Sequence, residues 1–431
     1  MQLSHFSWNL GGLALPLGVA FLTVPHLIEN LGQERFGLLA LAWGLIGYAG
    51  SLDLGLGRAL TQMVARMRGD GKLSSIPDVL TTAGRITLVT GLIGGGLIGI
   101  AALMGGQAWI RTQSTSASEI QSSMVLLAIA LPAQAMSATY RGLNEAFMNF
   151  KGISLLRAGL GVVNFAGPYA VSIFTIQLPW LVATLVVSRL MALLIFRHLA
   201  IQCLKYAPET RGPAVYSASI AKSLFAFGGW VTVSSIVSPI LVQADRFVIA
   251  ATISAAAVSV YVVPYELVVQ SLVLVGAVSS VMFPSLSQMV QEKPSEWEPY
   301  FFKWLIRVAC MMAVVCSALA FLLPLILPLW IKNNIQPESI LVGQVLCLGV
   351  FANALGSMFY ALLHARGRSD LTAKLHLVEA PFFLISLFYF IDEIGIVGVA
   401  WTWVARMIID LFSLIYFSRK LFFVDDGWFN I

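Results

Sequence analysis

The sequence has 431 residues, of which 58% are hydrophobic and only 11% are charged, and its formal net charge is +5. A soluble domain carries about 25% charged residues, so this chain has too few charges to cover a surface that faces water. The composition excludes an ordinary soluble protein and indicates an integral membrane protein.

Apolar runs long enough to cross a bilayer recur along almost the whole chain. A hydrocarbon core of roughly 30 Å requires about 20 helical residues, and such runs are centred near residues 19, 46, 94, 132, 164, 188, 233, 269, 316, 351, 383 and 406. Their content of Leu, Ala, Gly and Val is typical of helices and not of a β-barrel. The sequence therefore predicts an all-α membrane protein with twelve transmembrane helices.

The third run contains the glycine-rich stretch "GLIGGGLIG" at 91–99. Because it lies inside a predicted span, it indicates a surface for close helix packing and not a phosphate-binding loop. The sequence has no Walker A motif, no HExxH and no nucleophile elbow, and its four cysteines show no CxxC or Cys/His grouping. We therefore expect a carrier and not an enzyme, with no cofactor and no metal site.

Basic residues mark one side of the predicted membrane protein. Twenty of the 26 Lys and Arg residues lie in or beside the connections after the even-numbered runs or in the C-terminal tail, and the opposite side has only Arg35, Arg111, Arg246 and Lys332. Cytoplasmic connections carry an excess of basic residues, so both termini are predicted to be cytoplasmic. This distribution accounts for the net positive charge without a nucleic-acid partner.

The two halves of the sequence are weakly similar to each other. Trp8 and Trp230 open the first run of each half, and "SRLM" aligns with "ARMI", which matches Arg189 with Arg406. We predict two six-helix lobes related by a pseudo-twofold axis along the membrane normal, as in parallel-repeat transporters. The predicted parts are an N-terminal lobe, a cytoplasmic linker, a C-terminal lobe and a cytoplasmic tail, at residues 1–200, 201–221, 222–420 and 421–431.

Two blocks of sequence carry a family resemblance. The first is "LPLGVAFLTVPHLIENLGQERFGLLAL" followed by "SLDLGLGRALTQ", and the second is "ADRFVIAATISAAAVSVYVVPYELV" followed by "SSVMFPSLSQM". They resemble the polysaccharide flippases of the MATE-like (MOP) superfamily, and among these the O-antigen flippases of the Wzx type.

The resemblance implies a MATE-like transporter fold in a bacterial inner membrane. The implied activity is inversion of an undecaprenyl-diphosphate-linked oligosaccharide across that membrane. The implied partners are the lipid-linked oligosaccharide and membrane lipids, with the polysaccharide polymerase and the chain-length machinery as further candidates. A monomer is the favoured oligomeric state.

Arginines near the predicted membrane faces are candidate contacts for a diphosphate, because a guanidinium binds phosphate bidentately and stays protonated. Arg246 lies at the extracytoplasmic end of span seven, where Asp245 would orient it, and Arg58 and Arg85 lie at the cytoplasmic mouth. The alternatives are an ion pair for Arg246 and positive-inside anchors for the other two. For the deeper Asp53 we expect a salt bridge to a neighbouring helix.

Charged groups within the predicted spans are candidates for ion coupling or for pairing. Glu266 follows a proline in span eight and could carry a coupling proton or accept sugar hydroxyls, and Glu379 is a candidate of the same kind. Arg406 and Asp410 are four residues apart on one helical face, so we expect them to neutralise each other. Arg189 is expected to pair with another helix of its own lobe.

Prolines and aromatic residues in the predicted spans complete the candidate set. The candidate hinges are Pro16, Pro25, Pro239 and Pro264, in spans that line the cavity in the superfamily. Static kinks are the alternative. Trp230 and Tyr265 are candidates for stacking on sugar rings, and the alternative is an ordinary core or lipid-interface role.

The leading prediction is a flippase that works by alternating access through a cationic cavity between the lobes. The first alternative is an ion-coupled drug or metabolite exporter on the same scaffold, which an anionic, aromatic-lined cavity would favour. A membrane glycosyltransferase or polymerase is a remote alternative, because it would need a larger extracytoplasmic loop with acidic residues or a metal site.

Overall fold

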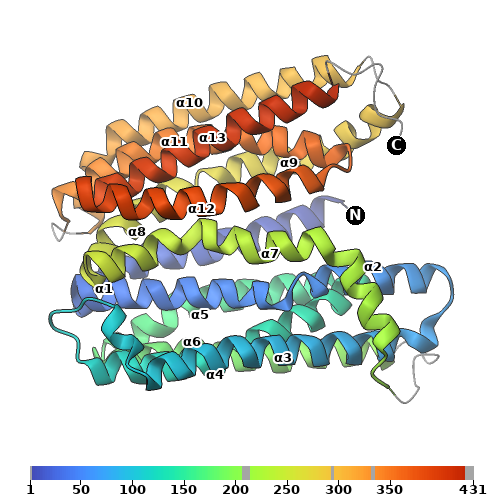
Figure 1. Cartoon of the computed structure of the whole chain (residues 1–431), viewed down its shortest axis with the longest axis horizontal. Coiled ribbons are helices and arrows are strands. Elements are labelled where there is room, and N and C mark those ends of the chain that lie inside the picture. The colour runs from blue at the N-terminus through green and yellow to red at the C-terminus, as the bar shows by residue number, and fades with distance from the viewer. Residues whose placement is uncertain (1, 206–213, 293–295, 332–334, 423–431) are drawn as a thin grey trace. The chain divides into compact units, whose positions relative to one another are not determined.

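The computed structural model describes residues 2–205, 214–292, 296–331 and 335–422, and all regular structure in these ranges is helical (Figure 1). The predicted all-α class is confirmed, and each predicted span centre lies within a helix. In the described chain, 8 helices are long and apolar enough to cross a membrane. The chain is therefore a multi-pass membrane protein, and the number of twelve spans stays a prediction.

Residue contacts divide the chain into two compact units. The N-terminal unit comprises Met1–Pro239 with Ser254–Val258, and the C-terminal unit comprises Ile240–Ile253 with Ser259–Ile431. The boundary falls inside α7 (Ala218–Thr252), later than the predicted linker at 201–221.

Hydrogen bonds explain why the segment before α7 belongs to the N-terminal unit. The amide of Val215 donates to the Asp78 carboxylate at 2.7 Å, and the amide of Ser217 donates to the Thr82 hydroxyl at 3.1 Å. Both acceptors lie on α3, so the chain is attached to the N-terminal unit as it enters α7. Residues 206–213 of the predicted linker lie outside the described residues, and the predicted lobe boundaries stay a prediction.

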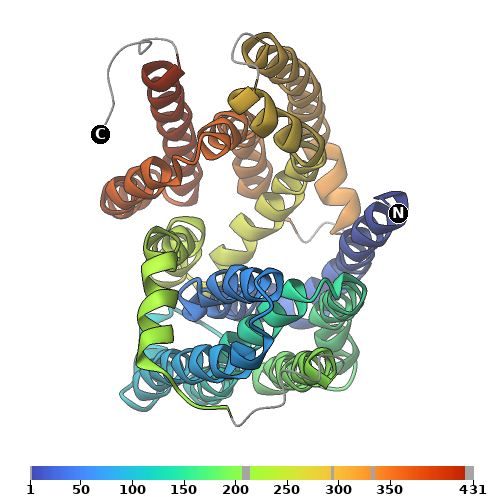
Figure 2. The same cartoon turned by 90° about the vertical axis from the view of Figure 1, so that its right-hand side faces the viewer.

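The N-terminal unit is a helical bundle, seen nearly end-on in Figure 2. Its helices before α7 are α1 (Gln2–Ala49), α2 (Leu56–Gly69), α3 (Ile76–Leu103), α4 (Ala117–Ala146), α5 (Phe150–Ser172) and α6 (Leu178–Lys205). The helical dihedrals of α1 are broken at Gly32, which has φ 74° and ψ 168°. A positive φ is readily adopted only by glycine, and this residue lies between the first two predicted span centres.

Small residues bring α3 and α4 close together. A Cβ added to Gly91 would lie 2.7 Å from the Cα atom of Pro132, and one added to Gly95 would collide with the carbonyl oxygen of Ala128. The backbones of the two helices therefore approach more closely than larger side chains would allow. This contact confirms the prediction that the glycine-rich stretch is a packing surface.

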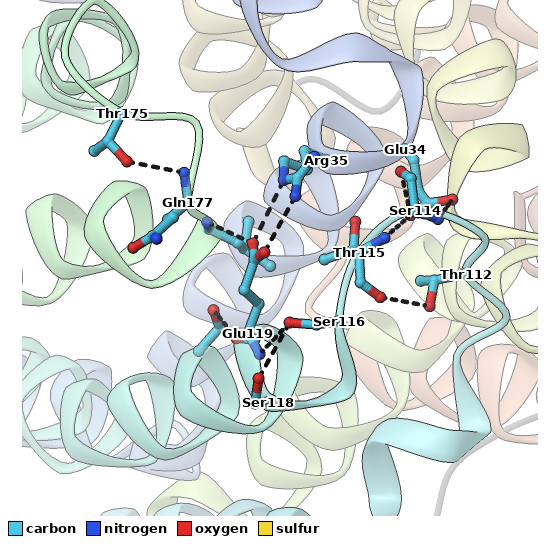
Figure 3. A network of polar contacts seen from close by, with 12 residues as sticks. Glu34, Arg35, Thr112, Ser114, Thr115, Ser116, Ser118, Glu119, Thr175 and Gln177 are labelled. Atoms are coloured by element: carbon cyan, nitrogen blue, oxygen red, sulfur yellow. Dashed lines mark hydrogen bonds and ion pairs between the residues drawn. The ribbon is translucent and has the colours of Figure 1, made fainter.

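Polar side chains join three connections at one end of the N-terminal unit (Figure 3). The carboxylate of Glu34 accepts hydrogen bonds from the amides of Gln113, Ser114 and Thr115 at 2.7 to 3.0 Å. Arg35 forms an ion pair with Glu119 at 3.1 Å. We call this network the polar clasp, and it fixes the start of α4 to the middle of α1.

The polar clasp also reaches the connection between α5 and α6. Glu119 accepts a hydrogen bond from the amide of Leu178, the first residue of α6, at 3.2 Å. The same carboxylate therefore binds Arg35 of α1 and the start of α6. This arrangement fixes the positions of α4 and α6 relative to each other.

The C-terminal unit is built around α11, most of which is buried. Its helices after α7 are α8 (Ala255–Val269), which belongs to this unit from Ser259 on, α9 (Leu272–Glu292), α10 (Trp297–Trp330), α11 (Pro337–Ala365), α12 (Ser369–Ile394) and α13 (Ile396–Phe422). A Cβ on Gly349 of α11 would collide with the ring of Trp403 on α13. This glycine therefore lets an aromatic ring pack directly on the backbone of α11.

Candidate functional site

The first of the two acidic residues in the second resembling block is completely buried. Asp245 on α7 is 0% exposed, and one of its oxygens accepts a hydrogen bond from the Tyr261 hydroxyl of α8 at 2.8 Å. The other oxygen accepts the backbone amide of Arg246 at 2.8 Å. Both carboxylate oxygens are therefore engaged inside the C-terminal unit, as a buried charge requires.

Arg246 is held by an ion pair in this structure. Its Nη2 atom lies 2.6 Å from Oε1 of Glu266, and the two side chains are 6% and 48% exposed. The guanidinium also lies 5.1 Å from the ring centroid of Tyr265, a distance at which cation–π attraction applies. The ion-pair alternative thus describes the resting geometry, and contact between Arg246 and a substrate stays a prediction.

A second charged centre joins α12 and α13. The Arg406 Nε atom lies 3.6 Å from Oε2 of Glu379, and both side chains are nearly buried. Arg406 also donates to the carbonyl oxygen of Leu241 on α7 at 2.8 Å, and its guanidinium lies 5.3 Å from the ring of Phe383. An arginine within a predicted span therefore contacts groups from two other helices, although its buried Nε and both oxygens of Glu379 have no hydrogen-bond partner in the described residues.

The expected neutralisation of Arg406 by Asp410 is wrong for the described chain. Asp410 instead lies 3.7 Å from Nε2 of His376. The reason is the register of the two helices. His376 and Glu379 are three residues apart on α12 and meet two residues four apart on α13, so each charged group of α13 meets a partner on the other helix.

His376, Glu379 and Asp410 together have the donor types of a cation site. Their ligand atoms all lie within 4.8 Å of one another, a grouping that the sequence analysis did not predict. The guanidinium of Arg406 already places a positive charge beside Glu379. The group is therefore better suited to hold a proton than a divalent metal ion, which would have to approach that positive charge.

Aromatic rings connect the two charged centres. Tyr261 stacks on Tyr265 with a centroid distance of 5.7 Å, and Tyr265 meets Trp403 edge-on at 5.6 Å. Trp403 precedes Arg406 by one turn of α13. The aromatic rings therefore extend from the charged groups of α7 and α8 to α13, where they end one turn away from Arg406.

The candidates in the N-terminal unit lie apart from that network along the chain. Asp53 is buried and accepts hydrogen bonds from the amides of Gly55 at 2.8 Å and Gly57 at 3.1 Å. The expected salt bridge of Asp53 to a neighbouring helix is wrong for the described residues. Its carboxylate instead stabilises the turn before α2, where Leu54 and Gly55 have positive φ.

The two arginines of the predicted cytoplasmic mouth are exposed. Arg58 lies on α2 and Arg85 on α3. The guanidinium of Arg85 lies 5.9 Å from the ring of Tyr216 in the segment before α7. The described contacts include none between the two arginines, so their joint action on one substrate stays a prediction.

The predicted hinge prolines all lie within helices. Pro16 and Pro25 lie in α1, and Pro264 lies in α8. The break in α1 occurs at Gly32, so neither proline marks the end of a helical segment there. Pro239 and Trp230 lie in α7, and their side chains lie outside the described residues.

Comparison with known proteins identifies relatives by sequence. A family model described as polysaccharide biosynthesis protein matches residues 4–290. A Shigella flexneri protein assigned as an O-antigen transporter is 28% identical over 415 residues, which cover 96% of this chain and 97% of that protein.

Comparison with solved structures identifies the fold. An inward-facing multidrug resistance MATE family transporter of the MOP superfamily matches with a TM-score of 0.75 and 14% identity, covering 96% of this chain and 98% of that chain. A mutant of a Vibrio cholerae MATE transporter matches with a TM-score of 0.62 and 15% identity, covering 98% and 99%. At these identities the likeness shows the fold alone, and the predicted MATE-like fold is confirmed.

Proposed function

The chain belongs to the polysaccharide biosynthesis protein family, and from this premise we propose that it transports a lipid-linked oligosaccharide across a bacterial inner membrane. The proposed cargo is an O-antigen or other surface polysaccharide repeat unit on undecaprenyl diphosphate. It would move from the cytoplasmic to the periplasmic leaflet, with both termini of the protein in the cytoplasm. The role involves no covalent chemistry.

One observation carries this proposal. The alignment with the S. flexneri O-antigen transporter covers 96% of the chain, whereas the MATE fold is shared with drug transporters and does not distinguish between cargoes. The full-length alignment therefore favours a polysaccharide precursor over a drug.

The diphosphate is the part of the cargo that most needs protein groups. A charged side chain at the centre of a bilayer costs about 2.5–3.5 kcal/mol even on the milder insertion scales, and a diphosphate carries more charge than one side chain. We assign the first contact to Arg58 and Arg85, which are exposed on the predicted cytoplasmic side. Arginine suits this contact because it binds phosphate oxygens in pairs.

The Arg246–Glu266 pair is the proposed contact of the later steps. The Glu266 side chain is half exposed and the Arg246 side chain is buried. A phosphate would therefore reach the pair from the side of Glu266 and replace its carboxylate as the partner of Arg246. Asp245 would orient the released guanidinium. The same exchange would uncover Tyr265 for a sugar ring, with Trp230 as a second candidate.

Alternating access is the proposed mode of movement. Its proposed hinges are Pro16, Pro25, Pro239 and Pro264, since proline removes a helical hydrogen bond and permits bending. Asp53 would keep the turn before α2 rigid while the helices bend.

A second candidate function is ion-coupled export of a small molecule. The clustered His376, Glu379 and Asp410 favour it, because such groups bind and release protons in membrane carriers. The same cluster also fits a flippase that uses a proton gradient, with Glu379 as the coupling carboxylate. The cargo therefore has to be tested directly.

The deciding experiment is deletion of the gene in its host, followed by measurement of the leaflet that holds the lipid-linked repeat units. We expect them to accumulate on the cytoplasmic leaflet and to be exported again when the wild-type gene is restored. Normal export from the deletion strain, with no second carrier present, would refute the proposal. Normal export together with increased drug sensitivity would instead support the exporter.

A further inference from the structure

Three arginines from different helices line one pocket of the N-terminal unit. The pocket has a volume of about 290 Å³ and lies between α4, α5 and α6. Its polar lining consists of Gln134, Ser137, Arg141, Arg157, Asn164 and Arg189, and none of its lining residues is acidic. We call it the arginine pocket.

Arg189 lies near the middle of α6. It is 11 residues from Leu178 and 16 residues from Lys205, the ends of the helix, which corresponds to about 16 and 24 Å at 1.5 Å per residue. An arginine at this depth is costly unless a partner or water satisfies it. Such a residue therefore marks a candidate site within the membrane.

The partners of Arg189 within the described chain are neutral. Its Nη2 donates to Oδ1 of Asn164 on α5 at 2.9 Å, and its buried Nε has no hydrogen-bond partner. Asn164 is itself fixed, because its backbone carbonyl accepts a hydrogen bond from the Trp43 indole at 3.0 Å. The expected pairing with another helix is present, but it leaves the positive charge of Arg189 without a carboxylate within 4 Å in the described residues.

The other two arginines add charge at the same place. Arg157 is exposed and forms no ion pair within the part of the chain that the structure describes. Arg141 forms a loose pair with Glu145 at 3.6 Å, and both side chains are partly exposed. The pocket therefore retains about two positive charges that protein groups do not balance.

An apolar groove adjoins the arginine pocket. It has a volume of about 610 Å³, lies between α5 and α6, and shares Leu160 and Ala192 with the pocket. From there it extends along both helices to Val171 and Trp180, near the connection between them. A cationic cavity thus lies beside a long apolar surface that suits a hydrocarbon chain.

We propose that the N-terminal unit binds the polyprenyl diphosphate end of the cargo before the later contact with Arg246, with the diphosphate in the arginine pocket and the prenyl chain in the groove. This inference rests on the proposed function and names the part of the cargo that this unit recognises. The charge is complementary, since a diphosphate diester carries two negative charges. A single groove fits one chain, whereas a bilayer phospholipid has two chains.

Binding of geranylgeranyl diphosphate to the purified full-length protein tests the proposal. The protein is held in phosphatidylcholine nanodiscs, and inorganic diphosphate and geranylgeraniol serve as head-only and chain-only probes. We expect the wild-type protein to bind geranylgeranyl diphosphate more tightly than either. Arg189→Gln should weaken that binding by about tenfold or more, since hydrogen bonds to charged groups contribute about 1.5–3 kcal/mol.

Matched variants separate the pocket from the groove. Gly159→Leu adds a side chain at a lining position of the groove where a Cβ meets nothing within 4 Å. It should weaken binding of geranylgeranyl diphosphate and leave inorganic diphosphate unchanged. Gly96→Leu, at an equally open position on α3, and Arg197→Gln, an exposed residue of α6 outside the pocket, should leave both unchanged.

Two results would overturn the inference. One is an unchanged affinity for geranylgeranyl diphosphate in both Arg189→Gln and Arg157→Gln. Arg157 is exposed, so its variant still tests the pocket if the substitution of the buried Arg189 prevents folding. Another is complete competition by phosphatidylglycerol in the nanodiscs, which would assign the pocket to a bilayer phospholipid. Failure of the proposed function would appear separately, as normal export from the deletion strain, and it would leave these affinities as measured.

Discussion

The ion pair between Arg246 and Glu266 supports an asymmetric prediction about stability. Arg246→Gln removes the positive charge beside Asp245, which is 0% exposed and whose charge Arg246 also balances. Glu266→Gln leaves that balance in place and removes only the half-exposed partner. We therefore expect the arginine substitution to be the more damaging of the two.

The burial of the two side chains gives the magnitudes. Removing one partner of a buried pair costs about 3–5 kcal/mol, and exposed pairs contribute about 0–1 kcal/mol. Arg246→Gln leaves a fully buried carboxylate and should cost about 3–5 kcal/mol. Glu266→Gln changes a side chain that is 48% exposed, so solvent screening should reduce its cost to about 1–2 kcal/mol.

The measurement is the apparent free energy of unfolding in a titration with sodium dodecyl sulfate, followed by tryptophan fluorescence. Glu298→Gln, at an exposed acid in the first turn of α10, is the matched control and should change nothing measurable. A Glu266→Gln cost equal to or larger than that of Arg246→Gln would refute the reasoning, because it would mean that Asp245 does not depend on the arginine.

Three further predictions concern packing and the other polar networks. Gly95→Leu should destabilise the protein by at least about 2 kcal/mol, because α3 and α4 must separate to accommodate the side chain. The control Gly96→Leu, at an open position, should be neutral. Equal effects of the two variants in the same unfolding titration would contradict the packing argument. Glu34→Gln should lower the free energy of unfolding by about 1–2 kcal/mol, because it weakens charge-assisted hydrogen bonds to three amides. Proteolysis of the 113–115 segment should also accelerate. An unchanged rate of cleavage would contradict the role given to the polar clasp. Arg406→Gln should destabilise the protein by about 3 kcal/mol, because it leaves the Glu379 carboxylate unpaired. Adding Glu379→Gln should restore part of the lost stability, since it removes that unpaired charge. Strictly additive costs of the two substitutions would exclude coupling between Arg406 and Glu379.

Local sequence features predicted the helices and the family well. Apolar runs of about 20 residues identify helices from composition alone, and the glycines at 91–99 indicated close packing before any partner was known. The family resemblance of the two quoted blocks is also confirmed, since both lie within the matched residues 4–290. These features depend on residues that are neighbours along the chain.

Pairs of charged groups were harder to predict, because they depend on the register between helices. The spacing of Arg406 and Asp410 is correct for mutual contact, yet α12 brings Glu379 and His376 into reach of them. The spacing between Asp53 and its glycines gave no sign that the carboxylate would turn back onto its own loop.

The arginine pocket could not be inferred from the sequence either. Arg141, Arg157 and Arg189 lie on three helices, and the first two are among the basic residues beside a predicted cytoplasmic connection. Their spacing along the sequence is a weak signal, and only the packing of α4, α5 and α6 shows that they line one pocket.

The depth of Arg189 has a consequence for biogenesis. Transfer of a nascent span from the translocon into lipid is disfavoured by about 2.5–3.5 kcal/mol when an arginine lies near its centre. The amide that accepts its hydrogen bond belongs to α5, which is synthesised first, so lateral release of α6 should depend on α5 remaining nearby. Arg246 and Glu266 are only 20 residues apart and can partition into lipid together as one hairpin.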